Sequence, residues 1–486
     1  MDATIVCPGD FEQKNHFYQK VLNAEVHPVV RNFLNMSNER IISRYCHLHP
    51  NVERAELERL MSYRPKHMHW AGTDLFCVAT PHGNRRMVVI ETNSSPSGQK
   101  SMPLLDDQKE HGGYYSLLND SFFPCLAQAD TPTGALAILY DKNMMEASGY
   151  AATMAEISGE EVYLVPFFQH DTDPPVRFDD GVLMVRHAER WHPIRGALRY
   201  VTQSPWNRIP IDTKTFIYNS VIVCLAGGRN KLVASIAYEM FNSSDLAETG
   251  LQVLTPLTKH DIFKRQVPFW VRSLGGHAVV KVPYSNAGQG VYTITTEEEL
   301  KAFMEYDHKY DLFIIQSLIG NSTWTSNSPH GTFFHIGTVP NKREEIYVAD
   351  VRMMLCATES GYRPVALYAR RTRTPLTQQP PKDTESWGML GTNLSIKTGE
   401  DQWETDTDRL LIMDKKDFNV LGIGIDDLIE GFVQTLLAAI AIDKMATKLV
   451  KDDGCFDRDL FRSFDNDAVL HREILNRTKK VVTGKD

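Results

Sequence analysis

The alternation of apolar and polar residues predicts strands and helices in turn through the middle third of the chain. Short apolar runs bounded by turn residues are typical of buried strands, and apolar residues three and four apart are typical of helices. In chain order the predicted elements are strand Ala135–Tyr140, helix Met145–Ile157, strands Glu161–Phe167, Val182–Val185 and Asn219–Leu225, and helix Asn230–Phe241. This order indicates an open α/β sheet. We predict a Rossmann-like domain over residues 131–245.

The segment before this domain divides into helices and a hairpin. Residues 1–65 have helical spacing, and Val52–Tyr63 is patterned as an amphipathic helix. Thr73–Ala79 and Met87–Thr92 have the pattern of apolar strands, and Pro81-His-Gly-Asn84 between them is a turn signal. We therefore predict a β-hairpin over residues 71–93.

After the Rossmann-like region the pattern becomes rich in strands. The predicted elements are helix Lys264–Leu274, strands Val279–Pro283 and Val291–Ile294, helix Thr296–Met304, and strands Phe313–Leu318, Ile346–Ala357 and Arg363–Arg371. A helix over 425–449 closes the core, and its apolar stretch Phe432–Ile442 is too short to cross a bilayer. We predict that this helix is buried and that the protein has no membrane partner.

Composition limits the class of protein. The chain has 486 residues, of which 42% are hydrophobic and 23% charged, so it is long enough for several globular domains. The net charge of −9 argues against nucleic acid as a partner. The seven cysteines occur singly without a C-x-x-C pair, and the first residues lack a secretory leader pattern. We expect a reducing, cytoplasmic location.

The hairpin carries the most informative chemistry. A turn centred between His82 and Gly83 places Asp74 opposite Glu91 on one face of the sheet, with Asn93 on the same face. Two facing carboxylates repel, so a cation between them is expected, and three oxygen donors suit Mg²⁺. The alternative is a hairpin whose acids meet only water.

Two further segments have the character of phosphate-binding elements. Lys281 ends a strand and is followed by a loop with Gly288 and Gly290, which is suited to cover a polyphosphate, although a plain tight turn explains the glycines equally well. Asp350 and Arg352 share one face of a strand, and Arg370-Arg371 end the next strand. Structural ion pairs are the alternative for these charges.

Together these segments resemble the ATP-grasp superfamily, whose members activate a carboxylate with ATP and usually join it to an amine. The matching segments are Ala71–Leu75 with Ile90–Pro96 (metal-binding end), Lys281 with its glycine loop (nucleotide-gripping strands), Ile314–Gln316 (hinge beside the adenine), Asp350–Arg352, Arg370-Arg371 and Thr392–Leu394 (around the triphosphate), and Gly228–Lys231 (lysine-bearing helix start).

The resemblance implies a cytoplasmic ADP-forming ligase that uses ATP and two Mg²⁺ ions. It implies small-molecule carboxylate and amine substrates, an amino acid or peptide among them, and an acyl-phosphate intermediate. The metal ligands would be Asp74, Glu91 and Asn93. Arg352 and Arg370 would be catalytic. The residues that would bind the nucleotide are Lys231, Lys281, Gly288, Gly290, Gln316, Arg371 and Asn393.

The order of the motifs differs from the usual family chain. There the Glu-x-Asn motif comes last, after the helix matched here by Asp426–Leu449, whereas here it comes first. We predict a circularly permuted ATP-grasp fold of the α/β (α+β) class with a Rossmann-like domain before the core. The predicted parts are a helical extension (1–70), the metal-binding end (71–130), the Rossmann-like domain (131–245), the nucleotide-binding subdomain (246–330), the second ATP-grasp subdomain (331–450) and a C-terminal tail (451–486).

Two other functions compete with the ligase. A permuted ATP-grasp scaffold that binds nucleotide as a sensor needs no turnover. Leu183–Glu189 is similar to the Arg-His-Gly-Glu signature of histidine phosphatases, in which His187 would accept a phosphoryl group. Ala188 replaces the glycine of that signature, and the segment lies far from the chain start, where that family places it.

Overall fold

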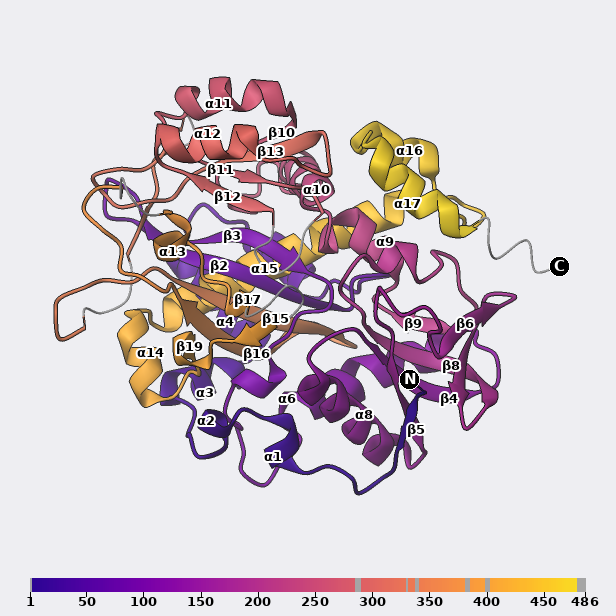
Figure 1. Ribbon diagram of the computed structural model, residues 1–486. Helices are drawn as coiled ribbons and strands as arrows, with labels where there is room; N and C mark the ends of the chain where they lie inside the picture. The colour runs from indigo at the N-terminus through magenta and orange to yellow at the C-terminus, as the bar shows by residue number, and fades with distance from the viewer. Residues whose placement is uncertain are drawn as a thin grey trace.

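The computed structural model describes residues 2–284, 290–328, 331–336, 341–380, 385–397 and 403–478 (Figure 1). Three main sheets organise these residues, each with helices packed beside it, which confirms the α/β class. The candidate site lies where the sheets approach one another.

The first sheet has the order β1-β5-β4-β8-β7-β6, and β9 also pairs with β8. Its strands are β1 (Thr4–Val6), β4 (Ala135–Tyr140), β5 (Val162–Pro166), β6 (Val176–Asp179), β7 (Val182–His187), β8 (Arg190–Tyr200) and β9 (Phe216–Tyr218). β4 runs parallel to both β5 and β8, and helix α8 (Met144–Ser158) connects β4 to β5. The order β4, α8, β5 is the predicted alternation of strand and helix, whereas the strand β8 was not predicted.

Two sequence-based expectations about this sheet were wrong in detail. The predicted strand Asn219–Leu225 is helical, because Asn219 has φ 53° and the chain then turns into α9 (Val221–Val223). The Asn219 side chain accepts a hydrogen bond from the backbone N–H of His69 at 2.8 Å and donates to the carbonyl of Ser94 at 2.6 Å. At the N-terminus, Thr4–Val6 is a strand rather than part of a helical extension, because it pairs antiparallel with β5.

The second sheet has the order β14-β2-β15-β16-β19, and β3 pairs with β2. It consists of β2 (Trp70–Ala79), β3 (Arg85–Asn93), β14 (Phe334–His335), β15 (Ala349–Thr358), β16 (Gly361–Arg371) and β19 (Leu410–Leu411). The predicted hairpin near the N-terminus therefore lies beside strands from the last third of the chain (Figure 1).

Helix α15 (Ile425–Lys448) covers one face of this sheet. A Cβ added at Gly431 would lie 3.1 Å from Leu75 Cδ1 and 3.4 Å from Met87 Cε, so glycine permits the close approach of helix and strands. The stretch Phe432–Ile442 is buried as predicted. None of the helices in the described ranges is both long enough and apolar enough to cross a membrane.

The carboxylate of Asp443 joins the far end of α15 to the segment that leads into β2. The Tyr63 hydroxyl donates to Asp443 Oδ2 at 2.7 Å, and the backbone N–H groups of His67 and Met68 donate to Oδ1 at 2.7 and 2.8 Å. The helix and the strand that the predicted permutation separates in sequence therefore meet in space. The permutation itself stays a prediction.

The third sheet has the order β10-β13-β11-β12, with β10 (Thr258–Phe263), β11 (Ala278–Lys281), β12 (Val291–Ile294) and β13 (Leu312–Ser317). Helices α11 (Val267–Ser273) and α12 (Glu297–Glu305) accompany it as expected. Thr296 caps α12 by accepting a hydrogen bond from the N–H of Glu299 at 3.2 Å.

Shorter elements complete the described chain. The α-helices are α1 (Gln13–His16), α2 (Gln19–Leu22), α3 (Pro28–Leu34), α4 (Asn38–Leu48), α5 (Arg54–Met61), α6 (Gly113–Leu117), α7 (Phe123–Gln128), α10 (Lys231–Ser243), α13 (Trp387–Leu390), α14 (Lys415–Leu421), α16 (Arg458–Phe464) and α17 (Ala468–Thr478). The 3-10 helices are η1 (Gln99–Ser101), η3 (Pro205–Asn207), η5 (Lys264–Gln266) and η6 (Thr407–Arg409), and the π-helical segments are η2 (Leu118–Phe122) and η4 (Cys224–Gly228). The strands are β17 (Ser395–Lys397) and β18 (Trp403–Thr405).

Candidate functional site

A cavity lies over the face of the second sheet that α15 does not cover. Its walls come from β2, β3, β15 and β16, from β11, β12 and β13 of the third sheet, and from the loop between β4 and α8 of the first. Among the described residues that line it, six are lysine or arginine and three are aspartate or glutamate. The cavity therefore favours an anionic ligand.

Strand register aligns the charged side chains on this face. Glu91 of β3 is opposite Asp74 of β2, Asp74 is opposite Arg352 of β15, and Arg352 is opposite Tyr368 of β16. The pairing of Asp74 with Glu91 was predicted, but a bulge between Asp74 and Leu75 produces it. Nearer the turn, Leu75 pairs with Val89, so Ile90 is the extra residue that shifts the register by one.

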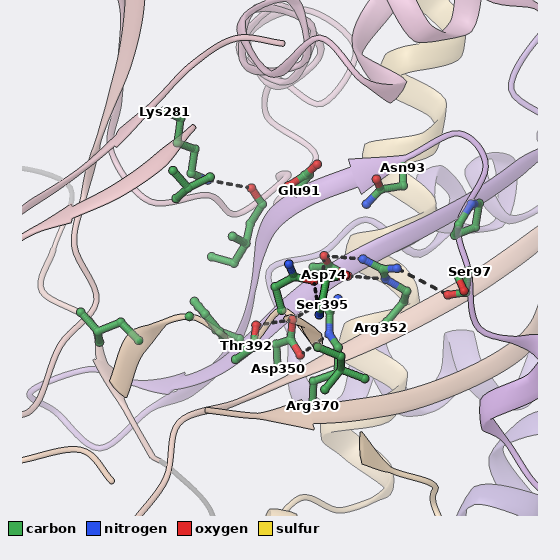
Figure 2. A pocket seen from close by; sticks show the side chains of 18 of the residues that line it. Asp74, Glu91, Asn93, Ser97, Lys281, Asp350, Arg352, Arg370, Thr392 and Ser395 are labelled. Atoms are coloured by element: carbon green, nitrogen blue, oxygen red, sulfur yellow. Dashed lines mark hydrogen bonds and ion pairs between the residues drawn. The ribbon is translucent and has the colours of Figure 1, made fainter. Parts of the chain in front are cut away.

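Asp74 is held by two guanidinium groups (Figure 2). Arg352 donates from Nε to Oδ1 at 2.6 Å and from Nη2 to Oδ2 at 2.7 Å, and Arg370 Nη2 lies 2.9 Å from Oδ2. Burial by itself raises the pKa of the Asp74 carboxyl, but the two arginines outweigh it and hold that pKa below its ordinary value. Asp74 is therefore a carboxylate that fixes both arginines.

Asp350 extends this cluster. It is directly opposite Arg370, whose Nε donates to Asp350 Oδ1 at 3.0 Å, and Thr392 Oγ1 donates to Oδ2 at 3.0 Å. Burial raises the pKa of Asp350, and the charge of Asp74 adds to that effect, while Arg370 opposes it. Two acids and two arginines thus form one buried network at the base of the cavity (Figure 2).

The three expected metal ligands lie together, but their surroundings differ. Glu91 has Lys231 Nζ at 3.6 Å from Oε1, and its carboxylate faces the cavity. Asn93 is buried, and its Nδ2 has no hydrogen-bond partner within the described chain. Asp74 has most of its acceptor capacity taken by arginine. Glu91 and Asn93 therefore have the acceptor oxygens most open to a cation.

This donor set fits Mg²⁺ bound together with phosphate. In the ranges that the structure describes, no group of three or more His, Cys, Asp or Glu side chains could hold a metal ion. Mg²⁺ keeps few protein ligands and takes the others from water and phosphate oxygens. A divalent cation at Glu91 and Asn93 would therefore depend on a phosphate-bearing ligand.

Two buried lysines flank Glu91 on the side of the third sheet. Lys281 ends β11, and its Nζ donates to the carbonyl of Ile90 at 3.3 Å. Burial lowers the pKa of Lys281 to about 8, with Lys231 adding to the effect and Glu91 opposing it. Burial likewise lowers the pKa of Lys231, which Glu91 opposes. A phosphate placed beside these lysines would favour their charged form.

The other residues predicted to bind the nucleotide differ in where they lie relative to the cavity. Gln316 and Asn393 line the cavity, and Gln316 Nε2 donates to Thr258 Oγ1 at 2.9 Å. Gly290 lies directly before β12, with φ 68°, and its carbonyl accepts a hydrogen bond from the N–H of Val282 at 2.7 Å. Gly288 lies outside the described residues.

Arg371 does not line the cavity. Strand alternation directs it away from Arg370, and its guanidinium lies over the ring of Tyr347, 4.7 Å from the centroid. Arg371 was expected to bind the nucleotide and Arg370 to be catalytic, but consecutive residues of a strand face opposite ways, so only Arg370 faces the cavity.

Several lining residues escaped the sequence analysis, above all Lys142 and Asn143 in the loop after β4. Lys100 in η1 also reaches the cavity, and so does Arg229, which belongs to the matched segment Gly228–Lys231 but was given no role there. One signal was present: β4 was predicted as a strand of a parallel sheet, and loops at the carboxyl ends of such strands commonly form ligand sites.

His187 lies elsewhere. It ends β7 at a tight turn in which Ala188 and Glu189 have φ of 48° and 60°. Its Nδ1 is 2.8 Å from the carbonyl oxygen of Ala3, and it is not among the residues that line the cavity. The histidine is therefore part of the contact between β7 and the N-terminal segment.

Solved structures similar to this chain include a glutathione synthetase like-effector from Globodera pallida, with 9% identity, coverage of 72% of this chain and 86% of that chain, and a TM-score of 0.39. A RimK domain protein ATP-grasp from Sphaerobacter thermophilus has 12% identity and a TM-score of 0.28, and the match covers 48% of this chain and 90% of that chain. D-alanyl-alanine synthetase A from Vibrio cholerae has 10% identity and a TM-score of 0.28, and the match covers 63% of this chain and 98% of that chain.

These neighbours include a protein described as ATP-grasp, the family that the sequence motifs resemble. Overlaps at these TM-scores support no inference about the reaction of this chain. No protein-family model and no curated protein matches the sequence.

Proposed function

We propose that this protein is an ATP-dependent ligase that joins a small-molecule carboxylate to an amine. The observation that carries the proposal is the arrangement within one cavity of Arg352 and Arg370, Glu91 and Asn93, and the buried Lys281. Fixed guanidiniums suit a carboxylate, and buried lysines beside oxygen donors suit a polyphosphate with its cation.

Lys281 and Lys231 bind phosphate oxygens in this proposal. Gln316 borders the nucleotide from β13. Glu91 and Asn93 would hold Mg²⁺, which would supply positive charge that neutralises the phosphates during transfer. Val291 and Thr293 of β12 form one wall of the nucleotide side.

Arg352 and Arg370 orient the substrate carboxylate. One carboxylate oxygen forms a bond to the terminal phosphorus of ATP, and the bond from that phosphorus to the bridging oxygen breaks as ADP leaves. The amine nitrogen, as its free base, then bonds to the acyl carbon, the carbon–oxygen bond breaks, and the departing phosphate takes the proton that the nitrogen loses. The arginines remain charged throughout and stabilise the oxygen that gains negative charge.

The proposal is tested by measuring ADP release with Mg-ATP, pooled amino acids and small carboxylates, with and without hydroxylamine. We expect ADP together with a hydroxamate, because hydroxylamine traps an activated acyl group. A pool that gives both products can be divided to identify the acid. Binding of the analogue AMP-PNP without ADP release from any pool would contradict the ligase and favour a nucleotide sensor, and absence of AMP-PNP binding would contradict both.

A further inference from the structure

A second group of positively charged side chains lines the side of the cavity that faces the first sheet. Lys142 follows β4, Lys100 lies in η1 and Arg229 follows η4, and all three side chains line the cavity. Lys100 and Arg229 are buried, at 5% and 6% exposure. Lys142 is close enough to Arg229, Arg352 and Lys100 for their charges to act on it.

The acids nearest to Lys100 and Lys142 are already satisfied, whereas Arg229 also lies within reach of the charge of Glu91. Glu146 is wholly buried, and its oxygens accept hydrogen bonds from Ser97 Oγ at 2.6 Å, Tyr200 Oη at 2.8 Å and the backbone N–H groups of Gly98 and Gln99 at 2.7 and 2.8 Å. Lys100 Nζ therefore reaches Glu146 only at 3.9 Å. Asp141, the acid next to Lys142 in the chain, is not available as a partner for Lys142 either.

That carboxylate, Asp141, is turned away from the cavity. It accepts hydrogen bonds from the N–H groups of Thr202 and Gln203 at 3.0 and 2.8 Å and pairs with Arg208 at 2.8 Å. Lys142 itself forms no hydrogen bond or ion pair with any part of the chain that the structure describes. Burial, with the neighbouring cations, lowers the pKa of Lys142 to about 7. An anion bound between Lys142 and Lys100 would raise the pKa of Lys142 again.

The nucleotide does not account for Lys100 and Lys142. Lys281 and Lys231 interact electrostatically with Glu91 and Asp74, on the side of the third sheet, whereas Lys142 interacts with Lys100 and Arg352. Arg229 lies between the two groups, because it interacts with Glu91 and Lys231 as well as with Lys142. Arg352 lies between the two sides and is committed to Asp74.

We propose that Lys100, Lys142 and Arg229 bind a second anionic group of the acid substrate, apart from the carboxylate that Arg352 and Arg370 orient. The substrate class is accordingly an acid with at least two anionic groups, a dicarboxylate, tricarboxylate or phosphocarboxylate. Asn143, whose Nδ2 donates to Ser97 Oγ at 3.3 Å, forms the neighbouring wall. This inference rests on the proposed ligase function.

The experiment measures acid binding by calorimetry with Mg²⁺ and saturating AMP-PNP present. Occupying the nucleotide side keeps the acids from binding to Lys281 and Lys231. The probes are succinate, glutarate, citrate and 3-phosphoglycerate, compared with propionate and butyrate. We expect at least one multiply charged probe to bind about tenfold or more tightly than either monocarboxylate. In Lys142→Met this preference disappears, whereas Lys142→Arg retains it because the charge is kept.

The matched control is Lys214→Met, an exposed lysine of the same domain that pairs with Asp180, and it keeps the preference. AMP-PNP affinity, measured first, separates the two proposals. AMP-PNP binding with no preference for any multiply charged probe, or with a preference unchanged in Lys142→Met, overturns the inference and leaves the ligase proposal standing. Failure of the wild type to bind AMP-PNP overturns the ligase proposal and the inference with it.

Discussion

Arg352 and Asp74 face each other across neighbouring strands and form two parallel hydrogen bonds, of 2.6 and 2.7 Å, although 278 positions separate them in the sequence. Such a bidentate pair fixes the plane of the guanidinium. Arg370 reaches the same carboxylate from β16 at 2.9 Å. Asp74 thereby sets the positions of both arginines before any ligand binds.

Replacement of Asp74 by Asn leaves two buried guanidiniums without their shared counter-charge. We expect a loss of about 3 kcal/mol in the free energy of unfolding, measured by urea denaturation near neutral pH. The pKa of Asp74 is lower in the folded than in the unfolded protein. Its stabilising contribution is therefore present above the unfolded pKa of about 4 and is lost as the pH falls toward the folded value.

The matched control is Asp180→Asn, which removes an exposed partner of Lys214 and costs less than about 1 kcal/mol. Equal stability losses in the two variants would mean that Asp74 does not hold the arginines in solution.

Replacement of Glu91 by Ala removes the carboxylate most open to a cation. We expect ADP formation to fall by about 100-fold or more, because the phosphate charge is no longer neutralised during transfer. Unfolding curves should change little, since Glu91 has only a long contact of 3.6 Å with Lys231. Glu189→Ala, at an exposed turn, is the control. Undiminished turnover in Glu91→Ala would exclude Glu91 as a metal ligand.

The charge of Lys281 makes nucleotide binding dependent on pH. Its pKa is lowered to about 8, mainly by burial, so in the free protein the amine loses its proton above that pH. Binding of a triphosphate then requires proton uptake. We expect the affinity for Mg-AMP-PNP to fall as the pH rises from about 7 to about 9, approaching tenfold per unit at the upper end.

Calorimetry in buffers of different ionisation enthalpy measures this proton uptake directly. Lys281→Arg should remove the dependence in this range, because a guanidinium stays charged. Proton uptake of equal size in wild type and Lys281→Arg would assign the titration to another group.

Glu430 on α15 provides a test of the buried helix. Burial raises the pKa of its carboxyl to about 7, and the charge of Arg86 only partly opposes this. The folded protein therefore keeps a proton that the unfolded chain releases at about pH 4. The contribution of Glu430 to stability is present below that pH and is lost as the pH rises to about 7.

Glu430→Gln should therefore gain stability relative to wild type as the pH rises from about 4 to about 8, on the order of 2–3 kcal/mol. Urea denaturation of both proteins across this range measures the difference. A constant difference at all pH values would show that Glu430 titrates normally in the fold.

The amino-acid pattern alone predicts most elements and identifies the central charged residues. Strand and helix periods are local, so Ala135–Tyr140, Lys264–Leu274 and the buried helix at 425–449 follow from neighbours in the chain. The same reasoning placed Asp74 opposite Glu91, but that pairing depends on the bulge at Ile90, which the hairpin pattern does not specify. It also placed Asp350 and Arg352 on one face of a strand.

The tertiary structure decided what these residues contact. Asp74 meets Arg352 and Arg370 only because β2 lies beside β15, a pairing that no local period specifies. Lys142 reaches the cavity because the first sheet directs the loop after β4 toward the second. Asn219 turns the chain because its partners come from residues 69–70 and 94. Contacts between distant segments depend on how sheets pack together, whereas element type depends on the spacing of apolar residues along the chain.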